Sequence, residues 1–328
     1  MRKLTRPRVS LPTLVRIRTK YPFNRAGVAE FPLGDWNNPD VRGALYAMHG
    51  RICAYCGSLA SDQRGDVEHY RPKSVYPWLT YEFRNYLLGC RVCNSSRKST
   101  EFPLFSSAKP LQYDPRMLED PDFLEKELAR EKRLLLDPAS DPVDDWLDIY
   151  YEEDLSEVRV SAIAAADRAS RQSVEQTIEF FGLNTIVELV RNRNQQVTAA
   201  IGALREWSEG NVASGDNVRV LSNRYTAHGW AVRRVAEVLA PNLRLPTAEE
   251  DLKWLVNETL ELLDIADRIL KKPILDKDRK QVVNRREESC WTLATLWKDP
   301  PAASSAEVGT WIDARGRRAV IEPFLKRL

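Results

Sequence analysis

The stretch CAYCGSLASDQRGDVEHYRPKSVYPWLTYEFRNYLLGCRVCNSSRK, residues 53–98, holds four of the five cysteines of this 328-residue chain. They form two Cys-x-x-Cys pairs, and each pair can present two thiolates to one tetrahedral ion. The 33 residues between the pairs exceed the ~15–20 of a simple zinc ribbon, so a further element is inserted there. We predict a structural zinc ion bound by four thiolates, with no open position for chemistry. Its ligands are Cys53, Cys56, Cys90 and Cys93.

The inserted segment has the pattern of a hairpin followed by a helix. DVEHYRPK (66–73) starts with strand-forming residues and is interrupted by Pro72, and YLLGC (86–90) is a second short apolar run. Asn94 and Ser95, directly after the second cysteine pair, suit the start of a helix. The stretch therefore predicts a ββα unit whose ends are joined by zinc.

The polar residues of this unit resemble the HNH endonuclease family, whose ββα-metal motif reads Asp/Glu-His, then Asn, then His or Asn. Here the motif residues are Glu68-His69, Asn85 and Asn94, an HNN variant with the cysteine pairs in the family's usual places. The resemblance implies a metal-dependent endonuclease that hydrolyses phosphodiester bonds, with DNA favoured over RNA.

The resemblance also assigns roles to these residues. His69 would activate water as a general base, because an imidazole can take up a proton near neutral pH. Glu68 and Asn94 offer hard oxygen ligands for Mg²⁺ or Mn²⁺. Asn85 would tie the loop and hold His69 in place. Alternation along a strand puts Glu68 and His69 on opposite faces unless a bend re-aims one of them.

Basic residues near the motif are candidates for phosphate contacts. They are Arg71, Lys73, Arg97 and Lys98. Taken singly, each candidate residue has a plainer interpretation, such as a surface histidine, a turn asparagine or a solvated base. Their order relative to the two cysteine pairs favours the functional interpretation. The remaining histidines, His49 and His228, and the lone Cys290 are expected to be structural.

A second resemblance extends beyond the core. HGRICAYCG (49–57), LLLDPASDPVDDWL (134–147) and IEFFGLNTIVELVR (178–191) are similar to the HNH proteins found with retrons and Septu-type antiphage systems. Such proteins carry an HNH core and a helical region, and they act with an ABC/SMC-like ATPase partner. The resemblance implies a nuclease effector of a bacterial antiphage defence complex.

The N-terminal region is basic. Residues 1–29 carry eight Lys/Arg and no Asp or Glu, although the whole chain has a net charge of only +2. Such an arm can neutralise phosphates, and a solvated or partner-bound tail is the alternative. No apolar run is long enough for a membrane helix, and arginines interrupt any signal-peptide core. We expect a soluble, cytoplasmic protein.

Helical signals dominate after residue 115. Capping boxes are predicted at Ser173–Gln176 and Thr247–Glu250, and Gly182 and Asn184 mark a helix end and the next N-cap. The predicted fold class is mainly α with a small ββα-metal unit and an all-helical C-terminal region. The predicted division is a basic arm (1–30), an HNH nuclease domain (31–115) and a helical region for partner binding or self-association (116–328).

Two other functions remain open on the sequence alone. The chain could be an HNH nuclease with a restriction or mobile-element role. It could also be a catalytically silent zinc module that binds nucleic acid. The presence of all four motif residues argues against the silent module.

Overall fold

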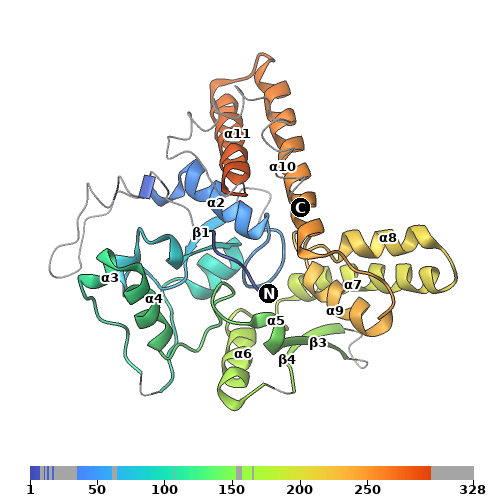
Figure 1. The fold of residues 1–328 in the computed structure, drawn as a ribbon, viewed down its shortest axis with the longest axis horizontal. Coiled ribbons are helices and arrows are strands. Elements are labelled where there is room, and N and C mark those ends of the chain that lie inside the picture. The colour runs from blue at the N-terminus through green and yellow to red at the C-terminus, as the bar shows by residue number, and fades with distance from the viewer. Residues whose placement is uncertain are drawn as a thin grey trace. The chain divides into compact units, whose positions relative to one another are not determined.

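The computed structural model shows a mainly helical chain with two small antiparallel sheets, as the sequence predicted for the fold class (Figure 1). It describes residues 1–7, 11, 13–14, 17, 35–60, 65–106, 108–152, 157–164 and 166–296. These residues belong to two compact units. The first unit comprises the described parts of Met1–Leu4 and Ile52–Leu245, and the second those of Thr5–Pro22, Glu30–Arg51 and Pro246–Leu328.

In the first unit, the segment between and directly after the two cysteine pairs folds as the predicted hairpin and helix. Strand β1 (Asp66–His69) pairs antiparallel with β2 (Tyr86–Gly89), in a register that sets Asp66 opposite Gly89 and His69 opposite Tyr86. The intervening loop contains two short 3₁₀ turns, η2 (Pro77–Leu79) and η3 (Phe83–Asn85). The helix after β2, η4 (Val92–Lys98), is a π-helix rather than an α-helix. This wider helix is rare in proteins, and where it occurs it is often found at a functional site.

A second layer of the first unit packs on the loop of the hairpin. It contains helices α3 (Arg116–Glu119) and α4 (Pro121–Arg130), and Asp120 caps the start of α4 with bonds to two main-chain amides. The buried side chains that join this layer to η2 are Tyr76, Trp78, Leu79, Met117 and Leu124. The loop between the two strands is therefore part of a core.

The region after residue 115 also contains a hairpin that the sequence pattern did not predict. After helix α5 (Val143–Trp146), strands β3 (Leu147–Glu152) and β4 (Glu157–Ala162) pair antiparallel. The outer edge of β4 is closed by side chains. Asn184 bonds both main-chain polar groups of Val160, while Asn194 accepts from the Val158 amide and Arg193 donates to its carbonyl. These bonds protect an edge that would otherwise be open to pairing.

Four further helices complete the first unit: α6 (Arg168–Phe180), α7 (Val187–Ser208), α8 (Val212–Leu221) and α9 (Gly229–Leu239). Apolar residues of α7 and α9 pack with Val158 of β4 in a buried cluster around Val197, and residues of α7, α8 and α9 form a second cluster around Leu204. The predicted N-cap at Ser173 is wrong, because α6 starts earlier at a cap formed by Asp167. Gly182 ends this helix with φ +61 as predicted, but Asn184 bonds β4 instead of capping α7.

The second unit is built from α2 (Pro39–His49), α10 (Ala248–Leu270) and α11 (Asp276–Leu296), with the short turn η1 (Asp35–Asn37) before α2. The predicted capping box at Thr247 and Glu250 is confirmed. Helices α2 and α11 approach closely because residue 43 is glycine. A buried ion pair between Arg42 and Glu288, 3.0 Å long, joins the same two helices.

Cys290 is fully buried in α11, which agrees with its predicted structural role. The predicted basic arm lies largely outside the described residues, apart from its first seven residues and a few isolated positions. Helix α2 contacts α11 and belongs with the last helices to the second unit, and the division at residues 30 and 115 stays a prediction. Among the described helices, none combines the length and the apolar character needed to cross a membrane.

Replacing Gly43 by alanine tests the close helix contact of the second unit. A Cβ there would lie 2.3 Å from the Cβ of Trp291 and 2.7 Å from the Glu288 carbonyl oxygen, so the helices must separate. We expect Gly43→Ala to destabilise by about 1–3 kcal/mol. The measurement is the midpoint of urea unfolding followed by circular dichroism.

Gly202→Ala is the matched control for this substitution. Gly202 lies inside α7 and has no atom within 4 Å of the added Cβ, so alanine should stabilise by about 0.5–1 kcal/mol. Equal midpoints for Gly43→Ala and the unsubstituted protein would contradict the close approach of α2 and α11.

Candidate metal centre and active site

Four buried cysteines meet at one point in the first unit. The sulfur atoms of Cys53, Cys56, Cys90 and Cys93 all lie within 4.8 Å of one another, and the sulfurs of Cys56 and Cys90 are 3.8 Å apart. Four thiolates at the usual Zn–S distance of about 2.3 Å have their sulfurs about 3.8 Å apart. The cluster could therefore bind a metal such as zinc, and its all-sulfur ligand set suits a structural ion.

Main-chain hydrogen bonds shape the turns that carry these thiols. In the first pair, the Cys53 amide donates to the Ser58 carbonyl (2.8 Å), and Gly57 adopts φ +78, a value that glycine takes without strain. In the second pair, the Cys93 amide points at the sulfur of Cys90 (3.5 Å). The Ala54 amide donates to the Leu88 carbonyl (2.9 Å), which ties the first turn to strand β2. The cluster and the hairpin are thus one assembly.

Glu68 and Asn94 lie beside each other across Gly89. A Cβ added to Gly89 would sit 3.2 Å from the Cβ atoms of both residues, so any larger residue there would crowd them. The Asn94 amide donates to a carboxylate oxygen of Asp66 (3.2 Å), which lies two residues before Glu68 on the same strand face. Two carboxylates and one amide therefore gather on this face of β1. Asp66 was not among the residues expected from the sequence, although its i, i+2 spacing to Glu68 is a usable signal.

The carboxylate of Glu68 is buried and already paired. Its Oε1 lies 2.7 Å from the ammonium of Lys98 and accepts a hydrogen bond from the Tyr55 hydroxyl (3.3 Å). Burial raises the pKa of Glu68 above its ordinary value, and the neighbouring Lys98 opposes that shift. Lys98 also donates to the main-chain oxygen of His69 (2.9 Å). The contact of Lys98 with Glu68 was not expected from the sequence, which assigned Lys98 to phosphate binding.

His69, the last residue of β1, leaves the strand on the face opposite Glu68. Its Nε2 lies 3.0 Å from the main-chain oxygen of Thr80, and its ring packs edge-on against Tyr86. A carbonyl oxygen only accepts, so Nε2 carries the proton of the neutral ring and Nδ1 is the basic nitrogen. Burial lowers the pKa of His69 to about 4, because the charged imidazolium loses its hydration. The ring is therefore neutral near pH 7, and burial makes it a weaker base than an exposed histidine.

Asn85 holds the main chain that follows His69. Its side-chain oxygen accepts from the Arg71 amide (2.8 Å), and its side-chain nitrogen donates to the Arg71 carbonyl (2.9 Å). The Asn85 carbonyl also accepts from the amide of Tyr70 (2.8 Å). These three bonds fix the backbone just beyond the histidine, as a residue that ties the loop should do.

The four candidate phosphate contacts fall into two groups. Arg71 is buried and pairs with Glu131 at 2.6 Å, and Lys98 is buried against Glu68, so both have structural partners in place of the predicted phosphates. Lys73 and Arg97 are exposed. Partial burial lowers the pKa of Lys73. An external phosphate can reach the side chains of Lys73 and Arg97 at the surface.

The two other histidines are buried. His49 is 1 % exposed in α2, and His228 is equally buried at the start of α9. The amide of His228 donates to the Gly57 carbonyl (2.7 Å), and its Nε2 lies 3.2 Å from the Ser58 hydroxyl. His228 thus supports the turn of the first cysteine pair, in agreement with its expected structural role.

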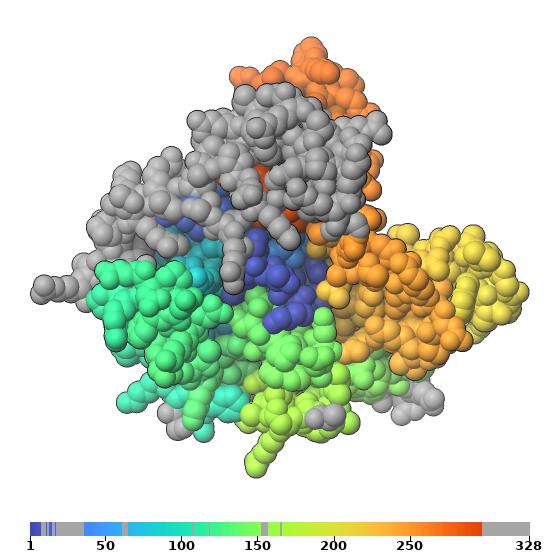
Figure 2. Space-filling model, in the orientation of Figure 1, coloured from blue at the N-terminus to red at the C-terminus, as the bar shows by residue number. Residues whose placement is uncertain are grey.

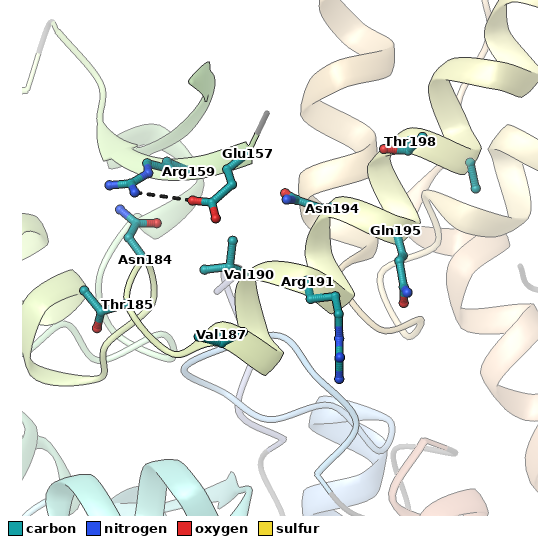
Figure 3. A pocket seen from close by; sticks show the side chains of 11 residues that line it. Glu157, Arg159, Asn184, Thr185, Val187, Val190, Arg191, Asn194, Gln195 and Thr198 are labelled. Atoms are coloured by element: carbon teal, nitrogen blue, oxygen red, sulfur yellow. Dashed lines mark hydrogen bonds and ion pairs between the residues drawn. The ribbon is translucent and has the colours of Figure 1, made fainter. Parts of the chain in front are cut away.

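An open pocket of about 980 Å³ lies elsewhere in the first unit, between β4 and α7 (Figure 3). Figure 3 shows Arg159 paired with Glu157, at 3.3 Å, beside Asn184 and Asn194. Both asparagines use their amide oxygens to bond the edge of β4. The pocket holds none of the motif residues, and its two asparagines bond the edge of β4.

Comparison with known proteins gives a partial match. The chain is 34% identical over 64 residues to the Septu protein PtuB of Bacillus thuringiensis. The match covers 19% of this chain and 25% of PtuB, so it spans a quarter of that protein's length. No family model and no solved structure match the chain. The similarity is local and does not assign the whole chain to a family.

Replacing a clamp cysteine tests the metal centre. We expect the purified protein to carry one tightly bound zinc ion and Cys53→Ser or Cys90→Ser to lose it, with unfolding of the region from about 45 to 100. The reason is that two four-residue strands and a short helix bury too little apolar surface to fold alone. Elemental analysis gives the zinc content, and limited proteolysis reports the unfolding.

The matched control is Cys290→Ser, which removes a buried thiol outside the cluster. This variant should keep its zinc. Folded, soluble protein without zinc, or equal zinc in the Cys53→Ser variant, would rule out the proposed clamp.

Proposed function

We propose that this protein is a metal-dependent endonuclease of the HNH type that hydrolyses phosphodiester bonds of nucleic acid, DNA ahead of RNA. One observation carries the proposal. Glu68 and Asn94 both lie close to Gly89, His69 ends the same strand as Glu68, and four cysteines gather at the turns on either side of this hairpin. The resemblance seen in the sequence assigns these residues to one catalytic motif, and their adjacency supports it.

The chemistry of the donor set fits a hard divalent cation. Glu68 and Asn94 would hold Mg²⁺ or Mn²⁺ through oxygen atoms, with the carboxylate of Asp66 beside them. When bound, such an ion stabilises the charge that develops on the leaving oxygen. Sulfur ligands suit zinc and oxygen ligands suit magnesium or manganese, so the two metal sites select different ions.

The task of His69 follows from its tautomer. With Nε2 occupied by the Thr80 carbonyl, Nδ1 takes the proton of the attacking water while the water oxygen bonds to phosphorus and the bond to the leaving oxygen breaks. Because Glu68 and His69 leave β1 on opposite faces, the substrate has to lie across the end of the strand to meet both. Asn85 would keep the backbone around His69 in place during this step.

The biological setting that we propose is bacterial antiphage defence, in a complex with an ABC/SMC-like ATPase in the cytoplasm. The local identity to the Septu protein PtuB and the resemblance to Septu-type HNH proteins support it. The helices after residue 160 would supply the partner surface. Val212 and Val220 on α8, whose atoms are coloured yellow in Figure 2, and Val238 and Leu239 on α9 are exposed apolar side chains.

His69→Ala tests the catalytic assignment. We expect single-turnover cleavage of plasmid DNA in Mg²⁺ or Mn²⁺ to fall by ~10²–10⁴-fold, because water is a poor nucleophile without a base. Zinc content and nucleic-acid binding should stay near those of the unsubstituted protein. The assay is run on DNA and RNA, with and without the ATPase partner, so that a need for the partner is recognised.

Ligand variants separate metal binding from proton transfer. Glu68→Gln and Asn94→Ala should raise the Mn²⁺ concentration that half-saturates cleavage, whereas His69→Ala should lower the rate at saturating Mn²⁺. Asn85→Ala should lower the rate partly. A rate for His69→Ala equal to that of the unsubstituted protein would refute the active site. Binding without cleavage under every condition would favour the silent zinc module instead.

Charge removal at Lys73 and Arg97 tests substrate binding. Each phosphate contact releases counterions, so Lys73→Ala and Arg97→Ala should each reduce the slope of log affinity against log salt concentration by about 0.7–0.9. Lys272→Ala, an exposed lysine of the second unit, is the control and should leave the slope unchanged. Unchanged slopes for all three variants would assign the phosphate contacts to other residues.

A further inference from the structure

Lys98 is a buried cation whose place in the site has no counterpart in the expected motif. Its side chain is 1% exposed, its ammonium lies 2.7 Å from Oε1 of Glu68, and it donates to the main-chain oxygen of His69 at 2.9 Å. It therefore contacts both members of the Glu68–His69 pair. Lysine is almost never buried in this way unless it is paired.

The ammonium lies on the carboxylate that is proposed to bind the divalent ion. Oε1 of Glu68 already receives Lys98 and the Tyr55 hydroxyl, while a bound Mg²⁺ or Mn²⁺ needs its oxygens at only about 2.0–2.2 Å. A lysine ammonium and a divalent ion on one buried carboxylate repel each other strongly, because little water separates them. The two cations thus compete for Glu68.

The backbone that carries Lys98 is strained where it ends. Lys98 is the last residue of the π-helix η4, which the Ser99 amide closes by donating to the Asn94 carbonyl (2.7 Å). Ser99 has φ +46, a left-handed value that costs a non-glycine residue free energy. Lys98 and Asn94, four residues earlier, lie on the same helix, and their side chains contact Glu68 and Asp66 of β1.

We propose that Lys98 is the resident counter-ion of the cation site: its ammonium pairs with Glu68 and opposes the binding of a divalent cation to this carboxylate. Lys98 is then a positioning residue that sets the affinity of the site for metal. The inference rests on the proposed function, because it takes Glu68 as a metal ligand.

The test measures Mn²⁺ binding, which does not depend on cleavage. Titration calorimetry on the full chain, with the zinc content checked for each variant, gives the dissociation constant, and the shift of melting temperature with Mn²⁺ gives an independent readout. Lys98→Met removes the competing charge, so we expect Mn²⁺ to bind at least ~10-fold more tightly than to the unsubstituted protein. Mn²⁺ should also raise the melting temperature of this variant by more.

Three further variants keep the test decisive. Lys98→Arg retains the charge and should bind Mn²⁺ as weakly as the unsubstituted protein. Lys98→Gln retains a hydrogen-bond donor without the charge, and it replaces Lys98→Met if that variant does not fold. Glu68→Gln combined with Lys98→Met removes both the competitor and its carboxylate, so it should show no gain in Mn²⁺ affinity.

The outcomes distinguish this inference from the nuclease proposal. Tighter Mn²⁺ binding by Lys98→Met or Lys98→Gln, without cleavage by any variant, would support the counter-ion role and refute the nuclease. Cleavage by the unsubstituted protein, with equal Mn²⁺ affinity in both neutral variants, would support the nuclease and overturn the counter-ion role. A gain that persists in the Glu68→Gln double variant would also overturn it.

Discussion

The unit formed by the β1–β2 hairpin and η4 depends on four thiols that lie close together. The hairpin has two strands of four residues and a helix of seven, so its own core is too small to hold it. The cysteine cluster joins the turn before β1 to the turn after β2, and the bond from Ala54 to Leu88 makes the first turn continuous with the sheet. This closure brings η4 against β1 and thereby sets Asn94 beside Glu68.

The second feature of this unit is that it buries charged side chains. Glu68 with Lys98, and Arg71 with Glu131, are ion pairs almost excluded from water. Such pairs add little net stability compared with apolar packing, but removing one partner costs about 3–5 kcal/mol because the other charge stays buried. Each pair therefore acts mainly to fix positions. Arg71 fixes the loop after His69, and Lys98 fixes Glu68 relative to the backbone of His69.

The sequence predicts those features that are defined by short patterns of neighbouring residues. The four cysteines, the order of Glu68, His69, Asn85 and Asn94, and the cap at Thr247 all follow from short patterns, and the cysteine cluster, the hairpin and this cap appear as expected. The nuclease roles of the motif residues stay predictions. The partners of Arg71 and Lys98 could not be read locally. Glu131 is 60 residues away from Arg71, and the burial of Lys98 depends on a π-helix that no simple periodicity reveals. The hairpin β3–β4 depends in turn on side chains of α7 that close its edge.

We propose that one small unit holds two distinct metal sites, a sulfur site for structure and an oxygen site for catalysis. The most direct test is to treat the purified protein with a chelator that leaves the clamp zinc bound, then to titrate Mn²⁺ while zinc content and DNA cleavage are followed together. We expect the zinc content to stay constant, no DNA cleavage before Mn²⁺ is added, and cleavage that rises with the Mn²⁺ concentration. Undiminished cleavage by the zinc-only protein, or no cleavage at any Mn²⁺ concentration with substrate and partner present, would contradict this proposal.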